Sequence, residues 1–243
     1  MTLTPTRRAG TVQLQQRDID GLVLCGEHGG APYDLLAAAL GVAPARLRGI
    51  TARWRKTGYA DTGQLGPGPA WCWLTAAGMT ATGLGYPPGP PSLARLEHAR
   101  AVLAVRLSLQ SRPELQQGRP WWQSERRIRR KGPLAGPHRP DAEIWWPADG
   151  AGHPGQVWAI ETELTPKHAD RTATIMRMLA AAGYDHILYF TTPAARPAIT
   201  RYAATILAAP ISVHALPPAA YTPPAGNQRR RAEYLQTYGK GTG

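Results

Sequence analysis

Residues 157–167, which read VWAIETELTPK, constrain the fold of this chain more than any other stretch. The stretch begins apolar, carries two carboxylates two residues apart, and then meets Thr165-Pro166, which is typical of a helix start because proline is tolerated at the first helical position. A strand followed directly by a helix is therefore predicted. Since side chains alternate along a strand, Glu161 and Glu163 share one face, roughly 6–7 Å apart along the backbone. Two like charges at that spacing favour a bound divalent cation, and the alternative is a solvent-facing strand edge with two solvated glutamates.

The net charge of the chain indicates a polyanionic partner. The 28 basic residues outnumber the 16 acidic ones, which gives a formal charge of +12 and favours nucleic acid. The positive charge gathers in residues 44–57 and 119–131, whereas residues 132–216 are close to neutral. The basic segments therefore flank the carboxylate region.

The two cysteines and the lengths of the apolar runs indicate the cellular compartment of the protein. Cys25 and Cys72 lie among apolar neighbours without CxxC spacing, so we expect buried free thiols in a reducing compartment and no zinc site. No apolar run approaches membrane-spanning length, and no charged-then-apolar leader opens the chain. We therefore expect a soluble cytoplasmic protein with no membrane partner.

The first third of the chain predicts three short helices and a hairpin. Apolar residues recur at helical spacing over residues 15–29, 32–40 and 44–58, and each run ends near a glycine. Two strand-like pieces separated by residues 66–69 follow, and the phrase WLTAAG begins another helical turn.

This order of elements resembles the winged helix-turn-helix family of DNA-binding domains over residues 15–85. The resemblance implies that residues 44–57 form a recognition helix that lies in the major groove, with a wing at residues 64–69 touching the DNA backbone. The alternative is a solvated basic face in a protein–protein module. The implied DNA contacts are Arg46, Arg48, Arg53, Arg55 and Lys56.

A second domain is predicted at residues 93–216, after a Pro- and Gly-rich linker at residues 86–92. A long helix is expected from Ser92 to about Leu109. Residues 121–129 read as a strand, with a helix as the alternative. The remaining expected elements are strands at residues 141–146, 157–164, 186–191 and 211–216 and helices at residues 166–182 and 197–208.

The order helix, strand, strand, strand, helix, strand resembles the PD-(D/E)XK nuclease superfamily, with Pro140-Asp141 opening one hairpin strand and Glu161-x-Glu163 in its partner. The winged-helix region and the words WWQSERRIR, HRPDAEIWW and VWAIETELTPK are similar to the actinobacterial replication-relaxation family associated with plasmids and integrative elements. The expected fold is therefore mixed α/β (α+β): an N-terminal winged helix-turn-helix and a C-terminal PD-(D/E)XK-like mixed sheet flanked by helices. A flexible arm is expected at residues 1–14 and a flexible basic tail at residues 217–243.

The nuclease resemblance implies metal-dependent phosphodiester hydrolysis with Mg²⁺ or Mn²⁺. It puts Asp141 and Glu161 at the metal-binding positions, and Glu125 matches an upstream acid that some members use. A lysine usually stands two residues after the second acid, and this chain has Glu163 there. Either Glu163 acts as a general base or added ligand, or Lys167 reaches back to supply the ammonium group.

One histidine and a second basic segment also bear on the predicted site. His138 precedes Asp141 by three residues and is expected to be an exposed turn histidine, and the alternative is that it approaches the proposed metal site. A second phosphate-tracking patch is predicted from charge density at Arg126, Arg127, Arg129, Arg130 and Lys131.

The function expected from these features is that of a nucleoid-associated double-stranded DNA-binding protein of a plasmid or integrative element, which nicks or cuts DNA. The alternatives are a non-enzymatic replication or transcription regulator with an inactive nuclease fold, and a partner-binding module. A homodimer and contacts with replication or transfer proteins of the same element are left open.

Overall fold

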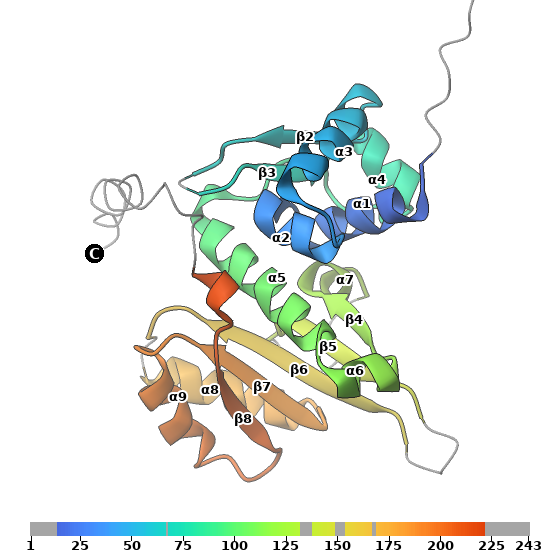
Figure 1. The fold of residues 1–243 in the computed structure, drawn as a ribbon. Helices are drawn as coiled ribbons and strands as arrows, with labels where there is room; N and C mark the ends of the chain where they lie inside the picture. The colour runs from blue at the N-terminus through green and yellow to red at the C-terminus, as the bar shows by residue number, and fades with distance from the viewer. Residues whose placement is uncertain (1–13, 67, 132–137, 149–153, 167–168, 222–243) are drawn as a thin grey trace, which may run out of the picture.

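The computed structural model describes residues 14–66, 68–131, 138–148, 154–166 and 169–221. It is a mixed α/β structure, as predicted. The described residues form a small antiparallel sheet with strand order β1-β3-β2 and a five-stranded mixed sheet with order β4-β5-β6-β7-β8. Helix α5 lies between the N-terminal helices and the large sheet (Figure 1).

The N-terminal module follows the predicted order. Gly29, with φ 72°, ends the first helix in the left-handed conformation that glycine favours. Pro44 begins the basic helix, and the Thr75 hydroxyl accepts a hydrogen bond from the Gly78 N–H at the start of the fourth. The elements are α1 (Gln16–His28), β1 (Ala31–Pro32), α2 (Tyr33–Ala39), α3 (Pro44–Lys56), β2 (Ala60–Gly63), β3 (Trp71–Leu74) and α4 (Ala76–Thr82).

The short strand β1 was not predicted. Its residues Ala31 and Pro32 pair with Cys72 and Trp71 of β3, which places β3 in the centre of the small sheet. Two residues give no alternating pattern, and Pro32 is accommodated because it lies on an edge strand. The predicted buried free thiols are confirmed: Cys25 and Cys72 are both buried, and their mutual hydrogen bond, together with burial, raises the pKa of Cys25.

The large sheet is antiparallel from β4 to β6 and parallel from β6 to β8. Helix α5 packs against one face through Ala101, Val105 and Leu109, and α8 packs against the other through Met176 and Leu179. The elements are the 3₁₀ turn η1 (Leu93–Arg95), α5 (Leu96–Gln110), α6 (Pro113–Gly118), β4 (Trp121–Ser124), α7 (Glu125–Lys131), β5 (Ala142–Trp146), β6 (Gln156–Glu163), α8 (Ala169–Ala181), β7 (His186–Thr191), α9 (Arg196–Ala203), β8 (Ile211–Ala215) and the 3₁₀ turn η2 (Pro218–Ala220).

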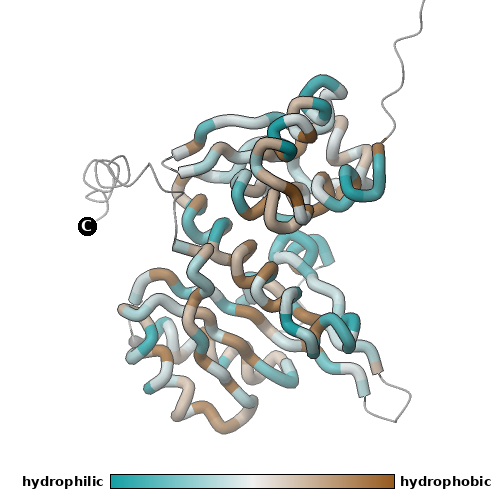
Figure 2. Tube along the Cα trace, viewed as in Figure 1, coloured by the Kyte–Doolittle hydropathy of each residue, from teal (hydrophilic) through white to brown (hydrophobic). Residues whose placement is uncertain are grey.

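The predicted strand over residues 121–129 is wrong in its second half. Strand β4 ends at Ser124, and α7 begins at Glu125. The hydroxyl of Ser124 accepts a hydrogen bond from the Arg127 N–H (3.3 Å), as an N-cap residue does. The residues that follow are mostly good helix formers, and α7 is almost wholly hydrophilic (Figure 2). Ile128 alone is buried in this helix, so the segment carries no apolar stripe at helical spacing from which the helix could be predicted.

Helix α5 joins the two modules. Leu103 and Ala104 belong to the apolar core of the N-terminal module, whereas Ala101 and Val105 belong to the core beneath the sheet. The helix is apolar on two sides for this reason. The linker expected at residues 86–92 therefore connects modules that share a buried helix.

Buried polar contacts also hold the modules together. Glu27, at the end of α1, is 4 % exposed. It accepts hydrogen bonds from Arg127 (2.7 Å), from the Tyr86 hydroxyl (3.2 Å) and from the Ser124 hydroxyl. Asp34 of α2 forms a second ion pair, with Arg100 of α5.

Replacing Glu27 by alanine is expected to lower the free energy of unfolding by about 2 kcal/mol, because the buried Ser124 and Tyr86 hydroxyls and the half-exposed Arg127 lose their acceptor. Urea denaturation measures the loss. Glu97, which is exposed on α5, provides the control, and Glu97→Ala should change stability by less than about 0.5 kcal/mol. Equal losses in the two variants would show that Glu27 does not hold the modules together.

No single helix among the described residues is long and apolar enough to cross a membrane. In the described ranges, one pair of helices, α2 and α3, bent by 98° relative to each other, meets that criterion of length and composition when taken together.

Candidate functional site

Helix α3 buries one side and exposes the rest. Leu47, Ile50 and Trp54 recur at helical spacing and are buried in the N-terminal core. The five basic residues predicted to contact DNA, namely Arg46, Arg48, Arg53, Arg55 and Lys56, are all exposed. The apolar stripe thus orients the basic surface of α3 outward.

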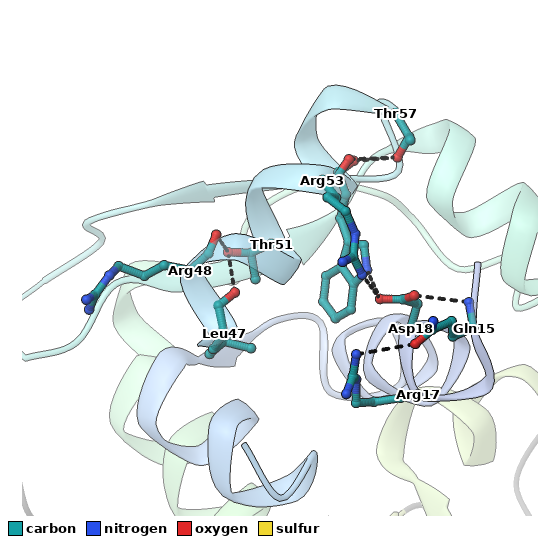
Figure 3. Close-up of polar contacts among 9 residues, drawn as sticks. Gln15, Arg17, Asp18, Leu47, Arg48, Thr51, Arg53 and Thr57 are labelled. Atoms are coloured by element: carbon teal, nitrogen blue, oxygen red, sulfur yellow. Dashed lines mark hydrogen bonds and ion pairs between the residues drawn. The ribbon is translucent and has the colours of Figure 1, made fainter. Parts of the chain in front are cut away.

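Two of these five residues form internal ion pairs. Arg53 donates to Asp18 of α1 (2.9 Å), which is 1 % exposed and also accepts from the Trp54 indole (3.0 Å). Burial alone would raise the pKa of Asp18, but the hydrogen bonds from the Gln15 N–H and Trp54 and the charge of Arg53 lower it on balance. Figure 3 shows Arg53 turned toward Asp18. Arg55 lies 3.4 Å from the exposed Asp61.

The other three basic residues of α3 form no ion pair with any residue in the described part of the chain. Arg48 points away from the other labelled side chains (Figure 3), and Arg46 and Lys56 are exposed. These three side chains are therefore available to a partner outside the chain. After β2, the Gln64 side chain donates to the Gly68 carbonyl (2.8 Å).

The predicted phosphate-tracking patch on α7 instead makes many contacts within the protein. Arg126 donates to the carbonyls of Gly26 (2.7 Å) and Pro87 (2.6 Å), and Arg127 pairs with Glu27. Arg130 donates to the Leu84 carbonyl, and the ammonium group of Lys131 lies 5.5 Å from the centre of the Trp145 ring. Much of the charge density that predicted a DNA surface binds the N-terminal module and the linker.

The pairing of strands β5 and β6 brings the two predicted metal-binding acids together. Ala142 of β5 pairs with Ile160 of β6, so Asp141, one residue before β5, lies across from Glu161. Both side chains are largely buried, with 14 % and 8 % of their surface exposed. Glu163, two residues further along β6, is buried on the same face as Glu161.

Each acid contacts a histidine. His98 of α5 lies with its Nε2 2.8 Å from Asp141 Oδ1, and Asp141 Oδ2 accepts a hydrogen bond from the Thr162 N–H (2.8 Å). Burial would lower the pKa of His98, but the bond to Asp141 and the charge of Asp141 raise it on balance. His138 lies with its Nε2 2.9 Å from Glu161 Oε1 and is partly buried, so the prediction of an exposed turn histidine is wrong.

A buried hydroxyl without a hydrogen-bond partner lies beside these acids. Tyr189 of β7 pairs with Glu161 in the parallel register, and its hydroxyl has no hydrogen-bond partner among the described residues. Burial and the charges of Glu161, Glu163 and Asp141 raise its pKa. The neighbouring Glu143, which is fully buried, accepts from the Tyr184 hydroxyl (2.8 Å) and the Trp145 indole (2.7 Å). The Tyr189 hydroxyl is therefore a buried donor that the charges of Glu161, Glu163 and Asp141 act on.

These residues partly fit a metal ion. Carboxylates are the ligands that hard cations such as Mg²⁺ and Mn²⁺ take, and Tyr189 has hydrogen-bonding capacity left beside them. With the side chains as they lie, no group of three or more His, Cys, Asp or Glu in the described ranges is arranged to hold a metal ion. Lys167, the predicted source of an ammonium group, lies outside the described residues.

Glu125, the predicted upstream acid, is held by two arginines. It is the first residue of α7, and its N–H donates to the Asp141 carbonyl (3.1 Å). One carboxylate oxygen accepts from Arg95 (3.0 Å) and the other from Arg129 (2.5 Å).

Proximity to Asp141 in the sequence allowed His138 to approach the site, but no pattern indicated its contact with Glu161 or the contact of His98 with Asp141. His98 lies 43 residues before Asp141, and His138 lies 23 residues before Glu161, so neither pair has a local spacing.

The chain matches no protein-family model, no curated protein and no solved structure.

Proposed function

We propose that this protein binds double-stranded DNA through a winged helix formed by residues 15–85. The observation that carries the proposal is the outward face of α3, where Arg46, Arg48 and Lys56 are exposed without ion pairs to the described residues. A helix of this kind fits the major groove, where arginine and lysine contact phosphates and base edges.

The arrangement of elements supports this identification. Helix α3 follows α2 after a short turn, and the β2–β3 hairpin lies beside it, with β1 completing a three-stranded sheet. The formal charge of +12 favours attraction to DNA. A cytoplasmic protein with this surface would associate with the nucleoid.

Fluorescence anisotropy with a short labelled duplex tests the proposal. We expect the affinity to fall steeply as salt rises from about 50 to 200 mM, with a log–log slope of about −0.9 for each phosphate contacted. Failure of the folded protein to bind the duplex at the lowest salt would refute the proposal.

The second candidate function is metal-dependent phosphodiester hydrolysis by a PD-(D/E)XK-like domain at residues 93–216. The position of Asp141 across from Glu161 favours it. Asp141 and Glu161 would hold Mg²⁺ or Mn²⁺, and Glu163 would act as a general base or a further ligand. The ion would supply an activated water and neutralise charge on the phosphate.

Conversion of supercoiled plasmid to nicked or linear DNA in the presence of Mn²⁺ or Mg²⁺ tests this second function. A folded protein that binds DNA but leaves the plasmid intact would instead be a non-enzymatic regulator. Both functions suit a replication-relaxation type protein of a plasmid or integrative element, which would act as a monomer or homodimer alongside other proteins of that element.

A further inference from the structure

A cavity of about 310 Å³ lies where the linker, α5 and α7 meet. Its lining includes Arg95, His98, Glu125, Arg126, Arg129 and Asp141. One of the two acids proposed to act on DNA therefore faces the same cavity as three guanidinium groups.

Two of the arginines share one counter-ion. Arg95 and Arg129 bind the two oxygens of the Glu125 carboxylate, so two positive charges are balanced by one negative charge. Their side chains are 49 % and 55 % exposed, whereas that of Glu125 is 26 % exposed. Each guanidinium carries five N–H donors, so both keep donors that are not used by Glu125. The third arginine differs, because Arg126 already binds two backbone carbonyls.

The shared carboxylate also fixes where the two charges lie. Arg95 precedes α5, and Arg129 belongs to α7, so Glu125 ties together two parts of the chain. The Glu125 N–H donates to the Asp141 carbonyl, which anchors the start of α7 beside the acid. Arginine pairs held in this way are suited to bind a phosphate group, which accepts hydrogen bonds from two guanidinium groups at once.

We propose that this cavity binds a phosphate group of the DNA strand that lies at Asp141, through Arg95 and Arg129, with Glu125 as the residue that positions them. The inference rests on the proposed DNA binding and on the second candidate function, which brings the strand to Asp141. The two arginines would supply the positive charge that a lysine supplies in the PD-(D/E)XK pattern, where this chain has Glu163. Glu125 is then a positioning residue and does not ligate a metal ion.

The test compares DNA affinity in two matched double variants by fluorescence anisotropy without metal ions. Arg95→Gln/Arg129→Gln removes the proposed phosphate contacts, and Arg177→Gln/Arg201→Gln removes two exposed charges from α8 and α9. We expect the first variant to bind about tenfold more weakly and its salt slope to fall by about 0.9 per arginine. The control should change affinity by less than about twofold.

Equal losses in the two double variants, or none in Arg95→Gln/Arg129→Gln, would overturn the inference while leaving DNA binding through α3 intact. Arg95→Gln alone serves as the second variant if the double one does not fold, because Arg95 lies in an exposed turn; unchanged affinity there would also overturn it.

The variant Glu125→Gln tests whether Glu125 positions Arg95 and Arg129 or affects DNA binding only through its negative charge. Removal of a negative charge should strengthen DNA binding if only net charge matters. If Glu125 positions the two arginines, the same substitution weakens binding. Stronger binding by Glu125→Gln would contradict the positioning role.

Discussion

Asp141→Asn and Glu161→Gln are each expected to lower metal-dependent plasmid cleavage about a thousandfold. Each substitution keeps the shape of the side chain but removes one of the two charges that lie across from each other between β5 and β6. A bound cation stabilises the reacting phosphate by several kcal/mol, and each 1.36 kcal/mol is about a factor of ten in rate. Gel assays of supercoiled plasmid with Mn²⁺ measure the rate.

A second readout does not depend on cleavage. Mn²⁺ should raise the melting temperature of the unchanged protein, because a ligand that binds only the folded state stabilises it. The shift should disappear in both variants and persist in Glu97→Gln, whose side chain is exposed on α5. Cleavage that persists in both variants would exclude these acids as the active site.

Neutralising the outward face of α3 should weaken DNA binding about a hundredfold at low salt. The variant is Arg46→Gln/Arg48→Gln/Lys56→Gln, which removes the three basic residues of α3 that have no ion pair in the described structure. Each phosphate contact contributes a slope of about −0.9 on the salt dependence, so three lost contacts lower the slope by about 2.7. Stability should change little, because all three side chains are exposed.

A triple variant of equal charge controls for net charge. Arg171, Arg177 and Arg201 are exposed on α8 and α9, and replacing all three by glutamine removes the same three charges. Its affinity should stay within a few-fold of that of the unchanged protein. If the two triple variants lose affinity equally, the chain binds DNA by overall charge and α3 has no special role.

Local patterns were sufficient to predict most elements. The helical spacing of Leu47, Ile50 and Trp54 predicted α3, and the apolar run with Thr165-Pro166 after it predicted the end of β6. The hairpin from β5 to β6 followed from two apolar stretches around a Gly-rich turn. Its register then placed Asp141 across from Glu161, as the resemblance to the PD-(D/E)XK superfamily had implied.

Long-range contacts could not be predicted from local patterns. The arginines of α7 resembled a DNA surface because nothing near them in sequence reveals that Glu27, 100 residues earlier, is the partner of Arg127. Likewise, the sequence around Glu125 gives no indication of Arg95, which lies 30 residues away. Such contacts depend on how α5 and α7 pack against the N-terminal module, and charge density alone cannot distinguish an internal ion pair from an exposed one.

Photo-crosslinking from α3 is the sharpest test of DNA binding by this helix. A benzophenone side chain would replace Ala52, which is exposed on α3, and in a second protein Thr200, which is exposed on α9. We expect a labelled duplex to crosslink to position 52 and not to position 200. Crosslinking from position 200 alone, or from neither position under conditions where anisotropy shows bound DNA, would contradict recognition through α3.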